Sequence, residues 1–384
     1  MRSRRLASSL VAGGLALALV ACTQVTSGDP PTGARTPPSP IPEPEPGPTG
    51  ASTGTSTGTP DTRARPVTIA LAGDVHFEGA LRRRLADPAT ALAPATRALA
   101  AADVAILNLE TSLGSGGRPE PGKRYTFQAP PSALRALTAA GVDVASQANN
   151  HALDFGRAPL PGALAAIAAA RSADPPLAVV GLGRDADEAF RPARTLVGDT
   201  VVATIAATVA GEDPTADPTG QWAATASSPG TADAVDPARL LRAVGAADRT
   251  ADVVVAYLHW GIQGDSCPTD DQRSLAADLV AAGADVVAGS HAHRLQGDGR
   301  LGAGYVAYGL GNYAWYTQDA EPTGVLTLTV RPGRTRAGRA RVVSAQWQPA
   351  RIGPDGLPAA LAPSDRPAFE ADREALRRCA GLTP

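Results

Sequence analysis

Two short segments of this chain carry metal-ligating side chains at i, i+2 spacing. Asp74 and His76 lie in GDVH, and His291 and His293 lie in GSHAH. In extended backbone, residues two apart point to the same side, so each segment can aim two ligands at one place. Carboxylates and neutral imidazoles are ligands of borderline divalent metals such as Mn, Fe and Zn. Either spacing alone is weak, but the two together indicate metal chemistry.

The histidines of the chain share one kind of position, at or just after the end of a predicted strand. A hydrogen-bonded histidine in the core or on the surface would explain any one of them, but it is a poor explanation for all. Further carboxylate and amide ligands occur in the same loops, and cysteine is absent from them, which argues against a structural zinc site. The residues concerned are His76, His151, His259, His291 and His293, with Glu110 and Asn150 beside them.

Short apolar runs that alternate with Ala-rich, helix-compatible stretches must position these side chains. Continuous hydrophobicity is typical of strands buried on both faces, so an α/β domain is predicted. Open α/β sheets build their sites at the carboxyl ends of strands, where the histidines occur. The predicted strands span residues 67–73, 103–109, 142–147, 177–182, 201–209, 252–258, 285–289, 305–310 and 324–330.

Two thirteen-residue segments are similar to each other, AAGVDVASQANNH at 139–151 and AAGADVVAGSHAH at 281–293. Each predicts a helix end, a Gly C-cap, a buried strand and a polar loop. His151 and His293 occupy the same position in the two segments. The general pattern of βα units, which favours Gly at the helix stop and Val in the strand, would also produce this similarity.

The order of these motifs resembles the calcineurin-like metallophosphoesterases. Within that superfamily, GDVHFEG, NLETSL, NNHALDFG, HWG, GSHAHRLQG and GLGNY resemble the CapA-type poly-γ-glutamate capsule synthesis family, over residues 67–352. The resemblance implies a metallophosphatase-like four-layer α/β/β/α sandwich with mixed sheets. It also implies a role in the synthesis, export or anchoring of an anionic capsule polymer such as poly-γ-glutamate.

The resemblance assigns a role to each site residue. Two divalent metal ions (Mn, Fe or Zn) are expected. His151 would contact the scissile group and protonate the leaving group, with Asp154 orienting it. Glu110 stands where phosphoesterases usually have Asp, and Ala152 stands where an acidic residue is common. The implied ligands are Asp74, His76, Glu110 and His293 for the first metal, and Glu110 as the bridging carboxylate, Asn150, His259 and His291 for the second.

Two other functions fit the same residues. One is a metal-dependent hydrolase of the phosphoesterase kind, which hydrolyses nucleotides or phospho-linked envelope polymers. The other is a non-catalytic protein that uses the metals to hold polymer. The positive charge of two divalent cations would exceed the negative charge of the expected carboxylates. An anionic polymer or a phosphoester is therefore the expected substrate.

The N-terminal residues predict a targeting segment followed by a tether. Arg residues precede a short apolar run that ends in LVAC, which resembles a bacterial lipobox with Cys22 as the lipidated residue. An ordinary signal peptide with a chance cysteine is the alternative. Residues 23–66, rich in Pro, Gly, Thr and Ser, predict a disordered tether. We therefore expect an extracytoplasmic lipoprotein with a 1–22 signal peptide, anchored to the cell membrane and partnered by a membrane-bound polymer synthase.

The folded part is predicted to comprise a domain at 67–352 and a C-terminal extension at 353–384 with a helix near 366–380. With Cys22 lipidated, Cys267 and Cys379 remain as a pair in an oxidising compartment, where a disulfide is favoured over two unpaired thiols. Such a bond would hold the C-terminal helix beside the loop after HWG.

Composition sets limits on the partners of the chain. Hydrophobic residues make up 43% of it, enough for a large core, and the formal net charge is -2. Lys123 is the single lysine, so no basic stripe is available for nucleic acid, which is excluded as a partner. Lys123, Arg124 and Arg184 are candidates for contacting an anion, although exposed basic residues are usually only solvated. GLGNY is expected to approach the site closely, and Trp260 either walls the cleft or packs in the core.

Overall fold

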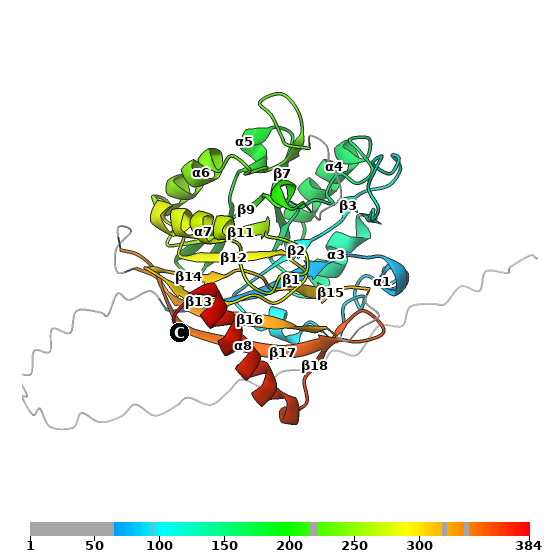
Figure 1. Cartoon of the computed structure of the whole chain (residues 1–384). Coiled ribbons are helices and arrows are strands. Elements are labelled where there is room, and N and C mark those ends of the chain that lie inside the picture. Colours follow the sequence, from blue (N-terminus) through cyan, green and yellow to red (C-terminus); the bar gives the residue numbers. More distant parts are fainter. Residues whose placement is uncertain (1–64, 94, 215–221, 317–320, 334–337) are drawn as a thin grey trace, which may run out of the picture. The chain divides into compact units, whose positions relative to one another are not determined.

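The computed structural model of the protein describes residues 65–93, 95–214, 222–316, 321–333 and 338–384 (Figure 1). The predicted signal peptide and the predicted tether up to residue 64 lie outside these residues. Within the described part of the chain, no helix combines the length and apolar character needed to cross a membrane.

Two mixed β-sheets form the centre of the fold. The first has eight strands in the order β18-β17-β16-β1-β2-β5-β6, with β15 also pairing with β1. Its strands are β1 Val67–Val75, β2 Val104–Leu109, β5 Val144–Ser146, β6 Ala178–Val180, β15 Asn312–Ala314, β16 Pro322–Arg331, β17 Arg341–Ile352 and β18 Pro358–Ala360. Strands β1, β2, β5 and β6 are parallel, whereas β16, β17 and β18 add antiparallel neighbours.

The second sheet has six strands in the order β13-β14-β12-β11-β9-β8. They are β8 Ala193–Val197, β9 Thr200–Thr208, β11 Val253–Trp260, β12 Val286–His291, β13 Asp298–Leu301 and β14 Gly304–Ala307. The four inner strands are parallel, and the two edge strands are antiparallel to their neighbours. Two small sheets pair β3 Ser112–Leu113 with β4 Gln128–Ala129 and β7 Leu182–Gly183 with β10 Gly230–Thr231.

The sheets pack face to face, and helices cover their outer faces. Ile69 and Ile106 of the first sheet share a buried cluster with Val255 and Val286 of the second. Leu137 of α3 belongs to a cluster on the outer face of the first sheet. Helices α6 and α7 supply a matching cluster on the second sheet. The helices are α1 Gly79–Arg84, α2 Arg97–Ala100, α3 Ser132–Ala139, α4 Leu160–Arg171, α5 Ala186–Ala189, α6 Ala238–Asp248, α7 Asp270–Ala282 and α8 Arg366–Ala380.

This arrangement confirms the predicted four-layer α/β/β/α sandwich with mixed sheets, and each of the nine predicted strands is present. The longest strand, β17, was not predicted. Its residues alternate between exposed and buried positions rather than forming an apolar run, because one face of it lies toward solvent. Continuous burial of β1, β2, β11 and β12 explains why their apolar runs were readable from the sequence.

The C-terminal residues are attached to the second sheet. Cys267 and Cys379 form a disulfide with a Cα–Cα distance of 5.8 Å, as predicted. Helix α8 also bears Arg373, whose guanidinium lies 2.9 Å from the Asp298 carboxylate at the start of β13. β18, beyond residue 352, pairs with β17 in the first sheet. The loop after HWG and the C-terminal helix are thereby joined, as the sequence indicated.

Replacing both Cys267 and Cys379 with Ser should destabilise the protein. The disulfide joins residues 112 positions apart, and a loop of that size is expected to contribute about 2–5 kcal/mol to the free energy of unfolding. Urea unfolding of the double variant and of oxidised wild type measures the difference. Alkylation of both thiols in the native, unreduced protein would contradict the bond.

Candidate metal centre

The carboxyl ends of strands from both sheets supply the polar residues of this centre. Asp74 lies at the end of β1, and Glu110 follows β2. From the other sheet, His259 lies near the end of β11 and His291 ends β12. Each of these four residues is fully buried. Tyr257 donates a hydrogen bond to the Ala72 carbonyl at 2.8 Å and so connects the two sheets beneath the centre.

The ligand atoms of Asp74, Glu110 and His259 lie within 4.8 Å of one another. His259 Nδ1 is 3.9 Å from Asp74 Oδ1, and its Nε2 is 3.7 Å from Glu110 Oε1. The same Nε2 lies 2.8 Å from Asn150 Oδ1 and 3.0 Å from His291 Nδ1. Carboxylate, amide and imidazole ligand atoms therefore converge at the place where the two sheets meet.

The Glu110 side chain provides the test of whether a cation fits here. Both of its carboxylate oxygens are buried and have no hydrogen-bond partner among the residues that the structure describes. Burial, and then the neighbouring Asp74 carboxylate, raise the pKa of Glu110 well above its ordinary value. Buried carboxylates normally accept hydrogen bonds or bind a metal. The surrounding imidazole and amide ligand atoms suit a divalent cation, so the residues fit a metal.

Asp74 behaves differently from Glu110. Burial raises its pKa, but the hydrogen bond from His293 and the nearby His259 outweigh burial and hold the pKa well below the ordinary value. Asn108 donates to its Oδ1 at 2.8 Å, and the backbone N–H of His291 donates to its Oδ2 at 3.2 Å. Asp74 is thus kept as a charged carboxylate, the form in which it can bind a metal.

Each histidine of the centre has a partner for its second ring nitrogen. His291 Nε2 lies 3.0 Å from Asp213 Oδ2, and His293 Nδ1 lies 2.8 Å from Asn312 Oδ1. His259 Nδ1 lies 3.2 Å from the Ser290 hydroxyl. Such partners fix the orientation of each ring beside the centre. Burial, and then the neighbouring His291, lower the pKa of His259 well below its ordinary value, which keeps this ring neutral.

The HxH segment is not extended, contrary to the prediction from its spacing. His291 has φ 94° and His293 has φ 55°. Residues other than Gly rarely adopt such positive φ angles. His291 remains fully buried, whereas the His293 side chain is 22% exposed. The two rings are separated because the strand ends at His291, and the hydrogen bonds to Asp74 and Asn312 hold the unusual backbone.

His151 faces the centre from the loop after β5, and Asp154 orients it as predicted from their spacing. Asp154 Oδ2 lies 2.6 Å from His151 Nδ1, while His151 Nε2 lies 3.6 Å from Glu110 Oε1. Asp154 is itself held by Lys123 Nζ at 2.6 Å, and both side chains are fully buried. Phe127 stacks on the His151 ring at 4.1 Å between centroids. The imidazole is therefore fixed on one face and at one nitrogen.

The structure does not bring His76 into the group, although it was predicted as a ligand of the first metal. Its Nδ1 lies 2.9 Å from the Glu78 backbone N–H, and its Nε2 lies 3.2 Å from that of Tyr316. Its ring packs between Phe127 and Trp315, at 4.9 and 4.1 Å. Both ring nitrogens thus face backbone donors, so the i, i+2 spacing after Asp74 reflects packing beside the centre.

Three other sequence expectations have clear outcomes. Arg184 is exposed and pairs with Glu188 at 2.7 Å, as a solvated residue would. Trp260 is fully buried and donates to the Tyr308 carbonyl at 2.7 Å, so it packs in the core. The GLGNY segment does approach the centre, because the Gly311 carbonyl accepts a 2.9 Å hydrogen bond from the Asp74 N–H.

Several residues of the centre were not predicted from the sequence. Asn108 and Asn312 lie inside the quoted motifs NLE and GLGNY, which gave a signal that was not used. Phe127 lies three residues after Arg124, in a segment whose basic residues were the predicted anion contacts. Asp213 follows β9 in an acidic loop with no recognisable motif, and only the tertiary structure places it on His291.

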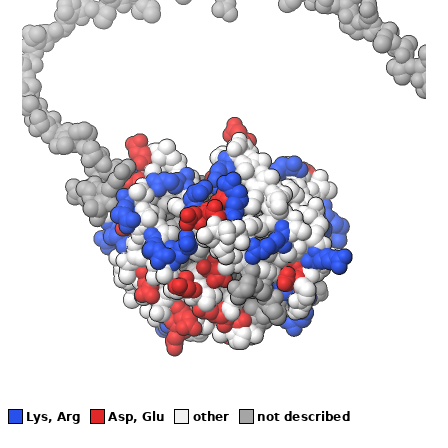
Figure 2. Space-filling model, turned by 90° about the horizontal axis from the view of Figure 1, so that it is seen from above, with Lys and Arg blue, Asp and Glu red and all other residues white. Residues whose placement is uncertain are grey.

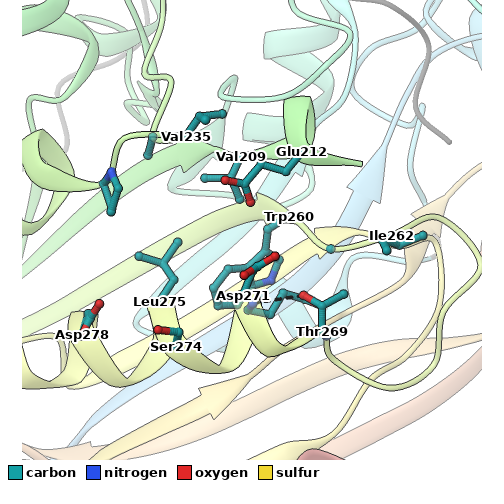
Figure 3. A pocket seen from close by; sticks show the side chains of 14 residues that line it. Val209, Glu212, Val235, Trp260, Ile262, Thr269, Asp271, Ser274, Leu275 and Asp278 are labelled. Atoms are coloured by element: carbon teal, nitrogen blue, oxygen red, sulfur yellow. Dashed lines mark hydrogen bonds between the residues drawn. The ribbon is translucent and has the colours of Figure 1, made fainter. Parts of the chain in front are cut away.

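The surface carries charged side chains of both signs. On the face seen in Figure 2, Lys and Arg side chains are interspersed with Asp and Glu, and no continuous basic stripe crosses it. A separate pocket beside the start of α7 has a volume of about 200 Å³ and contains Glu212, Asp271 and Asp278 (Figure 3). It is lined by Trp260 but by none of the predicted metal ligands or catalytic residues, and its carboxylates would repel an anionic substrate.

The chain is similar to known proteins of capsule synthesis and PGA biosynthesis. Residues 68–316 match the family described as bacterial capsule synthesis protein PGA_cap. The PGA biosynthesis protein CapA of Bacillus subtilis is 30% identical over 195 residues, 50% of this chain and 48% of that protein. A probable polyglutamine synthesis accessory protein of Mycobacterium tuberculosis is 32% identical over 202 residues, 50% of each chain. The chain thus spans about half the length of the curated relatives it matches. A phosphatase structure from Mycoplasma pneumoniae aligns over 75% of this chain and 94% of its own, with 10% identity and a TM-score of 0.45.

Replacing Lys123 with Met should destabilise the protein strongly. The change leaves the Asp154 carboxylate buried without its cation, and breaking such a pair costs about 3–5 kcal/mol. Urea unfolding at neutral pH measures the loss. Arg184→Gln is the matched control, because it breaks an exposed pair and should leave the free energy of unfolding almost unchanged. A Lys123→Met protein as stable as wild type would contradict the buried pair.

Replacing Glu110 with Gln should stabilise the metal-free protein at pH 7 by about 1–3 kcal/mol, because the wild-type carboxyl, which has no donor among the described residues, must be either buried as a charge or protonated above its ordinary pKa. Since the pKa of Glu110 is raised in the folded protein, wild-type stability should fall as the pH rises from about 4 through that raised pKa. The variant should lack this fall. Thermal unfolding with chelator tests the gain in stability and the pH dependence. Thermal unfolding with Mn²⁺ then tests Glu110 as a metal ligand, and a variant that gains as much stability from Mn²⁺ as wild type would contradict that role.

Proposed function

The chain belongs to the bacterial capsule synthesis protein family PGA_cap, and we propose that it acts in the synthesis, export or anchoring of an anionic capsule polymer such as poly-γ-glutamate. It would do so through a dinuclear metal centre. The family match covers the residues that form the centre, from Asp74 to His293. The observation that carries the proposal is the buried Glu110 carboxylate, which has no hydrogen-bond donor and faces His151 and His259.

The proposed ligands divide between two positions that share Glu110. Asp74 and His293 would hold one metal with it, and Asn150, His259 and His291 would hold the other. Two divalent cations would supply Lewis-acid polarisation of a bound anionic or carbonyl group. Mn, Fe and Zn all suit these oxygen and nitrogen ligands.

The chain's own residues add orientation and a proton. His151 presents Nε2 toward the centre, while Asp154 holds its Nδ1 at 2.6 Å. A proton held at Nε2 is therefore available to a leaving group that lies beside Glu110. Phe127 covers one face of the imidazole and limits the access of water. His151 and Asp154 are accordingly proposed as the acid and its positioning residue.

The charge of the centre favours anionic ligands. Two divalent cations carry more charge than Asp74, Glu110 and the nearby Asp213 together, and the charge of Asp154 is offset by Lys123. The centre would therefore keep a net positive charge and attract carboxylates or phosphates. Poly-γ-glutamate carries a free carboxylate on each residue, so it matches this requirement.

We also propose that the protein is held at the outer side of the cell membrane by lipid on Cys22, close to a membrane-bound polymer synthase. The Cys267–Cys379 disulfide supports an oxidising compartment, because such bonds are rare in the cytosol. Residues 23–66 would then give the domain its reach from the membrane.

A phosphoesterase acting on nucleotides or phospho-linked envelope polymers is the second candidate, favoured by the His151–Asp154 pair beside Glu110. A non-catalytic polymer-binding protein is the third. Activity on a chromogenic phosphodiester, measured at full metal occupancy, separates them. Turnover that is lost in His151→Gln favours the phosphoesterase, whereas absence of turnover favours polymer binding.

Metal content tests the centre directly. An Asp74→Ala, His291→Ala variant should lose most of its bound metal in elemental analysis, because it removes one ligand from each proposed position. His76→Asn should keep the wild-type content per folded protein, since both nitrogens of His76 face backbone N–H groups. Wild-type metal content in the double variant would overturn the proposed centre.

A further inference from the structure

An open hollow lies beside the metal centre, where the start of α1 meets the loops around residues 125 and 355. Its volume is about 570 Å³, within the range of roughly 300–1,000 Å³ common for ligand sites. We name it the tyrosine hollow. Its chemistry comes from Glu78, Arg124, Tyr125, Phe127 and Tyr316.

The tyrosine hollow begins one aromatic ring away from the proposed acid. Phe127, which lines it, stacks on His151 at 4.1 Å between ring centroids. Tyr316 is tied to the same region, because its backbone N–H lies 3.2 Å from His76 Nε2. A ligand in the hollow would therefore adjoin a group bound at the centre.

Two tyrosines and an arginine give the hollow its character. Tyr125 is 48% exposed and Tyr316 is 41% exposed, which is high for large aromatic side chains. The Arg124 guanidinium lies over the Tyr125 ring at 4.6 Å. Among the described residues, no carboxylate forms an ion pair with Arg124. The Glu78 carboxylate is already engaged by the Gln128 N–H at 2.8 Å and by Arg82 at 3.5 Å.

The hollow therefore presents one guanidinium and two exposed tyrosine side chains. A guanidinium recognises carboxylates through paired N–H donors, and tyrosine rings bind aliphatic stretches while their hydroxyls remain hydrated. The matching ligand has anionic groups separated by short aliphatic stretches. A γ-linked glutamyl chain has this pattern, because its free carboxylates alternate with methylene groups.

We propose that the tyrosine hollow is a polymer subsite that binds the γ-glutamyl segment flanking the group held at the metal centre, with Arg124 on a carboxylate and Tyr125 and Tyr316 against the methylenes. The inference rests on the proposed function and deepens it. A small substrate would occupy the centre alone, whereas a polymer extends into the adjoining hollow.

Calorimetric titration of Mn²⁺-loaded protein with γ-glutamate oligomers tests the subsite. Wild type should bind a long oligomer more tightly than a single γ-glutamyl unit. Arg124→Gln and Tyr316→Ala should each weaken binding of the long oligomer by about tenfold, with unchanged metal content. Arg184→Gln is the matched control and should bind as wild type does, since Arg184 is exposed and paired with Glu188.

The outcomes separate this inference from the proposed function. Length-dependent binding by wild type that both hollow variants retain in full would overturn the subsite and leave the proposed function standing. No binding of any γ-glutamate oligomer by metal-loaded wild type would overturn both. Loss of long-oligomer affinity in the hollow variants, with the control unaffected, would support both.

Discussion

The arrangement of this protein depends on a buried negative charge at the meeting point of two sheets. Glu110 has no hydrogen-bond donor for either carboxylate oxygen and lies near the carboxylate of Asp74. Such a site is unfavourable in an apolar interior unless a cation compensates it. The surrounding imidazoles and the Asn150 amide have ligand atoms suited to that cation. The residues of this centre therefore fit a metal ion, which would balance the buried carboxylates.

The two-sheet sandwich holds these groups in fixed positions. Parallel strands in each sheet end at the centre, and buried apolar side chains between the sheets keep the strand ends in register. Outer helices cover the opposite faces. The rigid framework sustains the positive φ values of His291 and His293, which would relax in a less constrained loop. The buried Lys123–Asp154 pair gives His151 a similarly fixed orientation.

The centre and the tyrosine hollow are proposed to bind neighbouring parts of one polymer. In the proposed function, residues around Glu110 would provide charge and a proton donor, while Arg124 and the two tyrosines offer a more open surface outside the centre. The acidic pocket near α7 provides a contrast, because its carboxylates suit no anionic chain. Capsule polymers are long and repetitive, so a compact reactive centre with an adjoining aromatic surface is a consistent design for this family.

The sequence alone indicated the buried strands and the polar residues at their ends, because a strand buried on both faces must be continuously apolar and its polar end is then conspicuous, whereas the four-layer order was implied only by the family resemblance. It also indicated Asp154 as the partner of His151 and the pairing of Cys267 with Cys379. It did not reveal β17, whose exposed face breaks the apolar run. Only the tertiary structure moved His76 out of the group, placed Asp213 on His291 and buried Lys123 against Asp154. Those contacts join residues 31 to 78 positions apart or depend on backbone N–H groups, so they are set by how loops pack and leave no local pattern in the sequence.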